Sequence, residues 1–326
     1  MTNKDFIPKI DLSNLIINGV KSPQSFDTIK EIKKACEEVG FFTVINHGIS
    51  NTSIEKILSN CKKFFSLPLE QKLTFAPQKW NKKSDTLYRG YFPSSVNGKE
   101  GFDIGDPLLK TSMKDLIQKE KFEVNHDMSS IDSEWQLNIN DYYNQVFKLG
   151  ITIFKALISF ISDNMEIADN AFQRPKTFST LRFNFYPKQN NPVEISSQDG
   201  VALGCETHVD SGIITILYQD QKGGLQVQNR NNSQWYDVPH DLNSFVINSG
   251  LALQYLTNDY FKATNHRVLV NKTERISIPF FFEPSYDFEL NPNYLGITDR
   301  PIHEVNNYEV FLTQSLRKFT EYNRNI

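Results

Sequence analysis

The sequence predicts an α+β fold in which helices pack around a double-sheet β core. Many short β-type runs separated by turn residues follow Phe178, a pattern typical of a sandwich or a barrel. Residues 133–164 keep apolar side chains at helical spacing for many turns and predict one long amphipathic helix, with Gly150 as its weak point. No internal repeat or long low-complexity linker divides the 326 residues, so a single domain is expected.

The first half of the chain predicts mixed structure. Helical spacing occurs in one run that ends at Gly40 and in another that stops at Pro68. Residues 76–126 are rich in Lys, Gly, Pro and Ser and hold no long periodic run, so they predict loops over the core. The expected elements are a strand at 8–13, a helix at 26–40, a strand at 41–46 and a helix at 53–68.

The second half predicts the strands of the core. Turn residues separate these runs, which are rich in β-branched and aromatic side chains. A helical stretch from Tyr308 to Tyr322 closes the chain. The predicted strands are "FSTLRFNFYP" (178–187), "GIITILYQD" (212–220), "GGLQVQN" (223–229), "QWYDV" (234–238), "SFVINSG" (244–250), "HRVLVN" (266–271) and "RISIPFFFEP" (275–284).

Composition excludes several classes of function. A formal net charge of -3 gives no electrostatic footprint for nucleic acid or an anionic membrane, so neither is expected as a partner. The cysteines, Cys36, Cys61 and Cys205, are too few for a disulfide framework or a Cys-based zinc site. The first residues contain no apolar signal-peptide core, and no apolar stretch is long enough to span a membrane. These features predict a cytoplasmic protein.

Among six histidines, His208 stands out because Asp210 follows it at the head of an apolar run. In a strand, residues two apart share a face, so both side chains would project together at the edge of the core. A metal would satisfy both, and His266, at the start of a later strand, is the best third ligand. Two histidines and one carboxylate form the facial triad that binds non-haem Fe(II) with open positions. The remaining histidines are expected to be structural or at the surface: His47, His126, His240 and His303.

Two further pairs have the same spacing on predicted strands. Arg275 and Ser277 would share a face, and an arginine fork beside a hydroxyl suits the carboxylate of a small molecule. Asn184 and Tyr186 form a similar pair on an earlier strand, where Tyr186 can add a phenolic donor. A zinc hydrolase could use the same three metal ligands, but it would leave Arg275 and Ser277 without a role.

With these residues assembled, the chain resembles the isopenicillin-N-synthase-like branch of the Fe(II)/2-oxoglutarate-dependent oxygenases over nearly its whole length. The resemblance rests on H-x-D-x-G-x-x-T from His208 to Thr215 and on R-x-S from Arg275. Leu251, after the glycine of "NSG", and Thr264, before the second histidine, depart from residues common in the family. Supporting segments are "GFFTVINHGI" (40–49), "FFSLP" (64–68), "YRGYFP" (88–93), "GGLQV" (223–227) and "LTNDYFKATNHRV" (256–268).

The resemblance implies a double-stranded β-helix, a distorted jelly roll with packed helices. Within one domain, 1–175 would be a helix-rich leading region, 176–290 the catalytic core and 291–326 an extension with a helix. The implied cofactors are Fe(II), 2-oxoglutarate as cosubstrate, and O2. The implied iron ligands are His208, Asp210 and His266, and the implied 2-oxoglutarate residues are Arg275, Ser277, Tyr186 and, with less support from the motif, Asn184.

The expected activity is oxidation of a small soluble metabolite, by hydroxylation or else desaturation or cyclisation, with succinate and CO2 as coproducts. Phe281 lies an even number of residues after Arg275, so it is expected on the same strand face and is a candidate to face the substrate. Arg89 could meet a substrate carboxylate or form a structural salt bridge. One alternative is an oxidase of the isopenicillin N synthase type, which uses no 2-oxoglutarate. Another is a non-catalytic relative that binds a metabolite. A monomer is expected.

Overall fold

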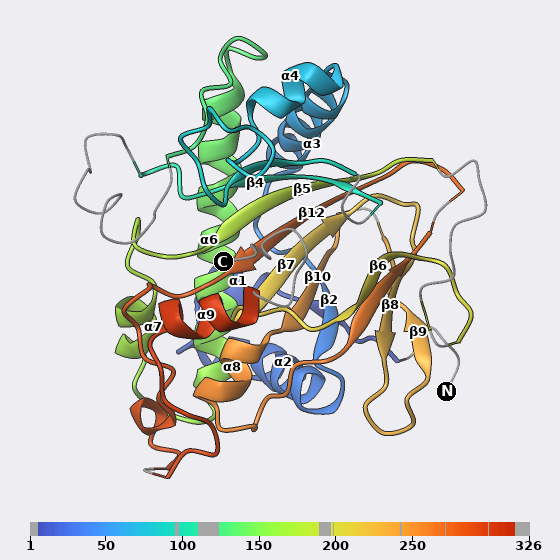
Figure 1. The fold of residues 1–326 in the computed structure, drawn as a ribbon. Coiled ribbons are helices and arrows are strands. Elements are labelled where there is room, and N and C mark those ends of the chain that lie inside the picture. Colours follow the sequence, from blue (N-terminus) through green and yellow to red (C-terminus); the bar gives the residue numbers. More distant parts are fainter. Residues whose placement is uncertain are drawn as a thin grey trace.

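Two β-sheets form the centre of the molecule, and helices cover the larger one (Figure 1). The computed structural model describes residues 6–94, 98–109, 124–188, 197, 199–241, 243–270, 272–298 and 300–316. In spatial order the eight-stranded sheet contains β1 (Lys9–Asp11), β2 (Phe41–Ile45), β10 (Phe245–Ser249), β7 (Ile214–Gln219), β12 (Arg275–Phe282), β5 (Thr180–Tyr186), β4 (Glu100–Ile104) and β3 (Gly90–Phe92). The four-stranded sheet contains β6 (Leu203–His208), β11 (His266–Leu269), β8 (Leu225–Gln228) and β9 (Trp235–Asp237).

The helices are short except for three. Figure 1 shows α6, α7 and α9 on one side of the view and the small sheet on the other. The α-helices are α1 (Ser13–Asn18), α2 (Phe26–Glu38), α3 (Asn51–Phe65), α4 (Leu69–Thr74), α6 (Trp135–Ile158), α7 (Glu166–Ala171), α8 (Leu251–Leu256) and α9 (Tyr308–Leu316). Short 3-10 turns occupy Pro23–Ser25 and Pro292–Leu295.

The long helix α6 confirms the predicted amphipathic segment. Its apolar side chains join the main hydrophobic core between the helices and the large sheet. Burial of each large apolar side chain stabilises the fold by about 1.5–3 kcal/mol, so this helix anchors the helical layer. At Gly150 an added Cβ would lie 2.6 Å from Cδ2 of Phe282, so the glycine allows α6 to approach β12 closely.

A second, smaller core fills the space between the two sheets. It contains Phe41 and Val246 from the large sheet and Val227 and Val268 from the small sheet. The inward faces of both sheets are therefore apolar around these four residues, as expected for two sheets packed face to face. The seven predicted strands of the second half are all present, as β5 and β7 to β12.

Two predictions about local structure were wrong. Residues 76–126 were expected to form loops, but β3 and β4 lie there and extend the large sheet beyond β5. His208 and Asp210 were expected on one strand, but His208 ends β6, Asp210 lies in the turn that follows, and β7 begins only at Ile214. Strand β6, "LGCETH", escaped prediction because it is polar and half-exposed and lacks a β-branched run.

The C-terminal helix is present as α9, which begins at Tyr308 as predicted. The rest of that prediction, 317–322, lies outside the described residues.

Gly40 follows α2 with a φ of +78°, so the predicted glycine C-cap is confirmed. Thr264, two residues before His266, donates a hydrogen bond from Oγ1 to the carbonyl oxygen of Val39, next to Gly40, at 2.7 Å. This hydrogen bond ties the segment before His266 to the end of α2.

Candidate metal centre

His208, Asp210 and His266 meet at one end of the space between the sheets. His208 on β6 is the register partner of His266 on β11, and the two ring centroids lie 4.2 Å apart. The Nε2 atom of each histidine is 3.6 Å from Asp210 Oδ1. One ligand atom from each of the three residues lies within 4.8 Å of the other two, so the group could hold a metal ion. Asp210 reaches the histidines from the turn after β6, not from the strand position that the sequence predicted.

Backbone carbonyl groups orient both imidazole rings. His208 Nδ1 lies 2.7 Å from the Glu206 carbonyl oxygen, and His266 Nδ1 lies 3.2 Å from that of Thr264. Because a carbonyl oxygen can only accept, each Nδ1 must carry the proton and donate it. This tautomer leaves the Nε2 lone pair of each ring directed at the shared site, as metal-binding histidines require.

Two side chains from the large sheet orient Asp210. Its Oδ2 accepts hydrogen bonds from Thr215 Oγ1 at 2.6 Å and from Asn248 Nδ2 at 2.8 Å. Oδ1 is the oxygen that faces the histidines. Burial raises the pKa of this carboxyl, but His266, His208 and Thr215 outweigh it and hold the pKa well below its usual range. Asp210 is therefore an anion with one oxygen committed to the protein and the other turned to the site.

A close contact between two glycines fixes the turn that carries Asp210. A Cβ on Gly250 would lie 2.2 Å from the Gly212 carbonyl oxygen, which is backbone and cannot easily move. The next residue, Leu251, donates its N–H to the Asp210 carbonyl at 2.8 Å. The start of α8 thus packs directly against the metal-ligand turn, and only glycine fits at the contact.

Arg275, Ser277, Asn184 and Tyr186 also come together, on the neighbouring strands β12 and β5. Arg275 is opposite Tyr186, and Ser277 is opposite Asn184. Arg275 is 1% exposed and donates from Nε to the Gly223 carbonyl at 2.8 Å and from Nη2 to Gln219 Oε1 at 3.2 Å. Its Cζ lies 4.8 Å from the centroid of the Tyr186 ring.

The guanidinium group of Arg275 is buried without a matching anion. Within the described part of the chain, its Nη1 has no hydrogen-bond partner and no carboxylate pairs with it. Asn184 Oδ1 is likewise buried and unpaired among these residues. A buried charge is costly unless it is paired, so this position suits an anionic ligand.

Cys205 and Lys99 lie behind His208, and sequence reasoning missed both. Cys205 Sγ is 3.9 Å from His208 Nδ1 and 3.3 Å from Lys99 Nζ. Burial raises the pKa of the Cys205 thiol, but the charges of Lys99 and His208 outweigh it and lower the pKa. No pattern in the sequence joins Lys99 to Cys205 and His208, because Lys99 directly precedes β4 and is far from β6 in the chain.

The two predicted substrate residues lie in different surroundings. Phe281 on β12 is the register partner of Thr215, whose hydroxyl binds Asp210, so its side chain is on the face of the large sheet that is turned toward the metal ligands. Arg89, just before β3, lies against Gly105, where an added Cβ would be 2.2 Å from its Nη1. The charge of Arg89 acts on the pKa of Tyr143 and of Glu283.

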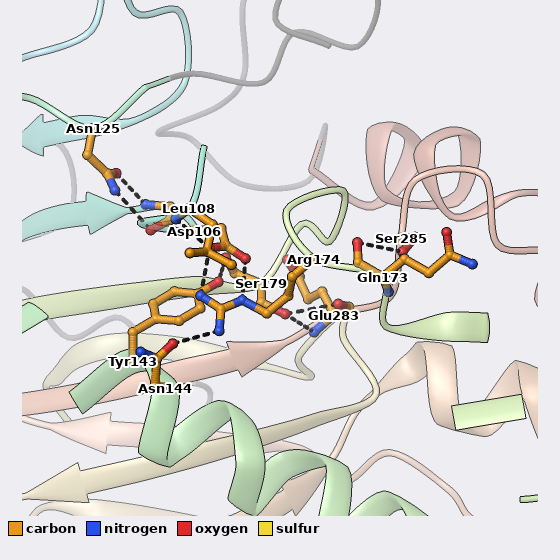
Figure 2. Close-up of polar contacts among 11 residues, drawn as sticks. Asp106, Leu108, Asn125, Tyr143, Asn144, Gln173, Arg174, Ser179, Glu283 and Ser285 are labelled. Carbon is orange, nitrogen blue, oxygen red and sulfur yellow. Dashed lines mark hydrogen bonds and ion pairs between the residues drawn. The ribbon is translucent and has the colours of Figure 1, made fainter. Parts of the chain in front are cut away.

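Figure 2 shows the polar cluster next to Gly105, which has a structural role. Arg174 donates from Nε and Nη2 to the two carboxylate oxygens of Asp106 at 2.6 and 2.7 Å, and from Nη1 to Asn144 Oδ1 at 2.7 Å. Tyr143 on α6 donates from its hydroxyl to the Ser179 carbonyl at 2.9 Å. These bonds join the end of β4 to α6 and to the chain that enters β5.

Three of the other histidines, His47, His126 and His303, contact residues outside the metal cluster. His47 Nε2 lies 3.2 Å from the Asn243 carbonyl oxygen, and His303 Nε2 lies 2.6 Å from Asp259 Oδ1. His126 packs edge-on against Phe75. In the described residues, only His208, Asp210 and His266 form a cluster able to hold a metal ion.

Comparisons with known proteins identify the family. Residues 177–284 match the model of the 2OG-Fe(II) oxygenase superfamily, and residues 7–146 match that of the non-haem dioxygenase in morphine synthesis N-terminal domain. Jasmonate-induced oxygenase 4 of Arabidopsis thaliana is 32% identical over 81% of this chain and 70% of its own length. The chain belongs to the 2OG-Fe(II) oxygenase superfamily. It is an enzyme of the Fe(II)/2-oxoglutarate-dependent dioxygenase family, as the sequence predicted.

Other members of this superfamily are similar over most of their length. Isopenicillin N synthase of Streptomyces griseus is 28% identical over 88% of this chain and 87% of its own. A full-length Neurospora crassa protein, whose crystal structure was solved in complex with alpha-KG, is 26% identical, with a TM-score of 0.77 over 95% of each chain. The predicted double-stranded β-helix fold is confirmed. None of the helices in the described residues has the length and apolar character that crossing a bilayer requires.

Proposed function

We propose that this protein binds Fe(II) through His208, Asp210 and His266 and uses 2-oxoglutarate and O2 to oxidise a small soluble metabolite. Hydroxylation is the expected outcome, and succinate and CO2 are the coproducts. One observation carries the proposal above the others: a metal-competent triad lies beside Arg275, a buried guanidinium that lacks an anion among the described residues. The donor set fits, because two neutral imidazoles and one carboxylate suit Fe(II) and leave positions open.

Each protein group has a distinct task in this proposal. Arg275 would pair with the distal carboxylate of 2-oxoglutarate, while Ser277 and Tyr186 add hydroxyl donors and Asn184 adds an amide. The Nδ1–H bonds of the histidines and the two bonds to Asp210 Oδ2 keep the ligands in place before iron arrives. Phe281, on the same sheet face, would help to exclude water from the reacting C–H bond. When bound, Fe(II) and its cosubstrate supply the oxidising power for that bond.

A spectroscopic experiment tests this proposal without knowledge of the substrate. Under anaerobic conditions, purified protein with Fe(II) and 2-oxoglutarate should develop a weak visible charge-transfer band that Fe(II) alone does not give. In air, slow uncoupled turnover should release succinate. Protein with Fe(II) and succinate in place of 2-oxoglutarate is the control and should show no band.

The same experiment separates the second candidate function. An oxidase like isopenicillin N synthase would need no 2-oxoglutarate, and the 28% identity to that enzyme keeps this candidate open. It predicts iron-loaded protein with no band, no succinate and no response to 2-oxoglutarate. Such a result would contradict the proposed cosubstrate and leave the three metal ligands in place.

Replacement of Thr215 by valine should weaken metal binding while the fold remains. The change keeps the shape of the side chain but removes the donor at 2.6 Å from Asp210 Oδ2, so the carboxylate loses one of the two hydrogen bonds that orient it. Loss of such an outer partner typically weakens metal affinity by about 10–100-fold. Competition with a fluorescent chelator for Mn(II) measures the effect, and Thr215→Ser, which keeps the hydroxyl, is the matched control. Equal affinity in all three proteins would show that this bond does not position Asp210.

A further inference from the structure

Arg182 lies on the same face of β5 as two of the residues that we assign to 2-oxoglutarate. It precedes Asn184 and Tyr186 at intervals of two, and alternate residues of a strand share a face. Its register partner on β4 is Asp103. On β12, Phe281 is opposite Thr215, whose hydroxyl binds the metal ligand Asp210. Arg182, Asp103 and Phe281 therefore all lie on the metal-facing side of the large sheet.

The guanidinium group of Arg182 is held in a fixed orientation. Nε donates to Asp103 Oδ1 at 2.5 Å, and Nη2 donates to Asp103 Oδ2 at 2.7 Å. Its Cζ lies 5.5 Å from the ring centroid of Phe281 and 5.6 Å from that of Phe92, within cation–π range of both. The side chain of Arg182 is 12% exposed, against 3% for Asp103. A long side chain that is otherwise flexible is thus preorganised beside aromatic rings.

Glu283 lies beside the turn that carries Asp210. It directly follows β12, and a Cβ on Gly212, in the metal-ligand turn, would lie 3.1 Å from its Cγ. Burial raises the pKa of Glu283 to about 8, and the negative charges of Asp103 and Asp210 both add to the increase.

A purely structural role explains the ion pair poorly. Strands β4 and β5 already pair over five register positions, from Glu100 with Phe185 to Ile104 with Leu181. A buried ion pair adds little net stability, because desolvation of both charges offsets their attraction. Arg174 shows that such a pair can be structural here, because it also binds a carboxylate through two N–H groups and contacts Tyr143 and Phe147. Those rings belong to α6, on the helical side of the large sheet, so Arg182 differs from Arg174 in facing the metal site.

We propose that Arg182, fixed by Asp103 and flanked by Phe281 and Phe92, anchors the substrate, and that it binds an uncharged carbonyl oxygen on a flat molecule. The inference rests on the proposed function, because it assigns the substrate class for that site. Asp103 balances the charge of Arg182, so a second carboxylate would gain little attraction and would be repelled by Asp103. A carbonyl oxygen accepts from the guanidinium group without bringing a charge into a buried site. The ring of Phe281 supplies a surface on which a flat ligand can stack.

Benzamide and benzoate form a matched pair of probes, because they have the same shape and differ in charge. Isothermal titration of anaerobic protein loaded with Fe(II) and 2-oxoglutarate should show that benzamide binds and that benzoate binds at least about tenfold more weakly, as expected for one unbalanced buried charge. Arg182→Gln should weaken benzamide binding about tenfold, the effect of one charge-assisted hydrogen bond. The charge-transfer band with 2-oxoglutarate should be unchanged in this variant.

Arg174→Gln is the matched control, since it removes a similar ion pair on the helical side and should leave benzamide binding unaltered. If Arg182→Gln fails to fold, as judged by thermal unfolding, Arg182→Lys replaces it, because lysine keeps the charge but loses the fork and should also weaken benzamide binding. Benzoate binding as tight as benzamide, benzamide binding that Arg182 variants do not weaken, or no benzamide binding would each overturn the inference. A missing band in the wild-type protein would instead count against the proposed function.

Discussion

Replacement of Asp210 by alanine is expected to remove Fe(II) binding and, with it, turnover. Asp210 is the only anion among the three candidate ligands, and its pKa is held low enough to keep it charged. With alanine at position 210, the site keeps two neutral imidazole ligands and loses its carboxylate ligand. Removal of a residue that only orients a metal ligand typically lowers metal affinity by about 10–100-fold. Removal of the ligand Asp210 itself should lower the affinity for Fe(II) by more than that. Metal analysis after gel filtration and succinate release in air measure the two effects.

The fold should survive this change. Thr215 and Asn248 would each lose their acceptor on Asp210, at a cost of about 1–3 kcal/mol for each unsatisfied group, which is within the about 5–15 kcal/mol stability of a typical domain. Asp259→Ala is a matched control, because it removes a carboxylate that also pairs with a histidine, His303, outside the metal cluster. That variant should keep its iron. Asp210→Ala protein that retains stoichiometric Fe(II) and full succinate release would overturn the assignment of the triad.

The strands of the second half could be predicted because their side chains alternate or are rich in β-branched and aromatic residues. Strands β3, β4 and β6 could not, for a physical reason. They are three to six residues long, and β4 carries a partly buried Glu100 and a buried Asp103, which pair with Lys72 and Arg182. Charged residues are usually exposed, so a short segment that contains them is predicted to be a surface loop. The partners that pair with these charges lie far away in the chain and are not visible from the segment itself.

The candidate metal ligands were identified from the sequence, but the argument from a shared strand face was incorrect. Asp210 faces His208 because of the turn after β6 and the close contact of Gly250 with Gly212. Thr215 and Asn248 were not predicted as partners of Asp210, although both lie in predicted strands. Their role depends on the pairing of β7 with β10, where Asn248 is opposite Thr215, and strand register between distant segments cannot be deduced from one sequence.

Arg182 is a similar case. Its spacing from Asn184 and Tyr186 is visible in the sequence, and the same parity argument that selected Arg275 and Ser277 applies to it. The partner Asp103 could not be predicted from the sequence, because it lies in a segment predicted to be a loop. It meets Arg182 only through the pairing of β4 with β5. Substrate contacts in a fold of this kind are thus harder to predict than metal ligands, because they depend on side chains from several strands at once.

Replacement of Arg275 by lysine is expected to weaken 2-oxoglutarate binding before it lowers the maximal rate. Arginine serves Gly223, Gln219 and the proposed carboxylate at the same time, through Nε, Nη2 and Nη1. Lysine keeps the charge but has no planar fork, so it cannot make all these bonds from one fixed position. Loss of one charge-assisted hydrogen bond corresponds to about 1.5–3 kcal/mol, so the apparent KM for 2-oxoglutarate should rise by about 10–100-fold.

Iron content distinguishes a cosubstrate anchor from a structural support. If Arg275 acts only on 2-oxoglutarate, Arg275→Lys should bind as much Fe(II) as the wild type, and its charge-transfer band should appear at higher 2-oxoglutarate concentration with the same final intensity. Arg267→Lys is the matched control: it changes a buried arginine next to His266 that pairs with Asp199 and contacts Trp235, on the opposite face of its strand from that ligand. This control should leave the apparent KM for 2-oxoglutarate unchanged. Loss of iron from Arg275→Lys, or a KM that does not move, would mean that Arg275 supports the barrel and that the carboxylate binds elsewhere.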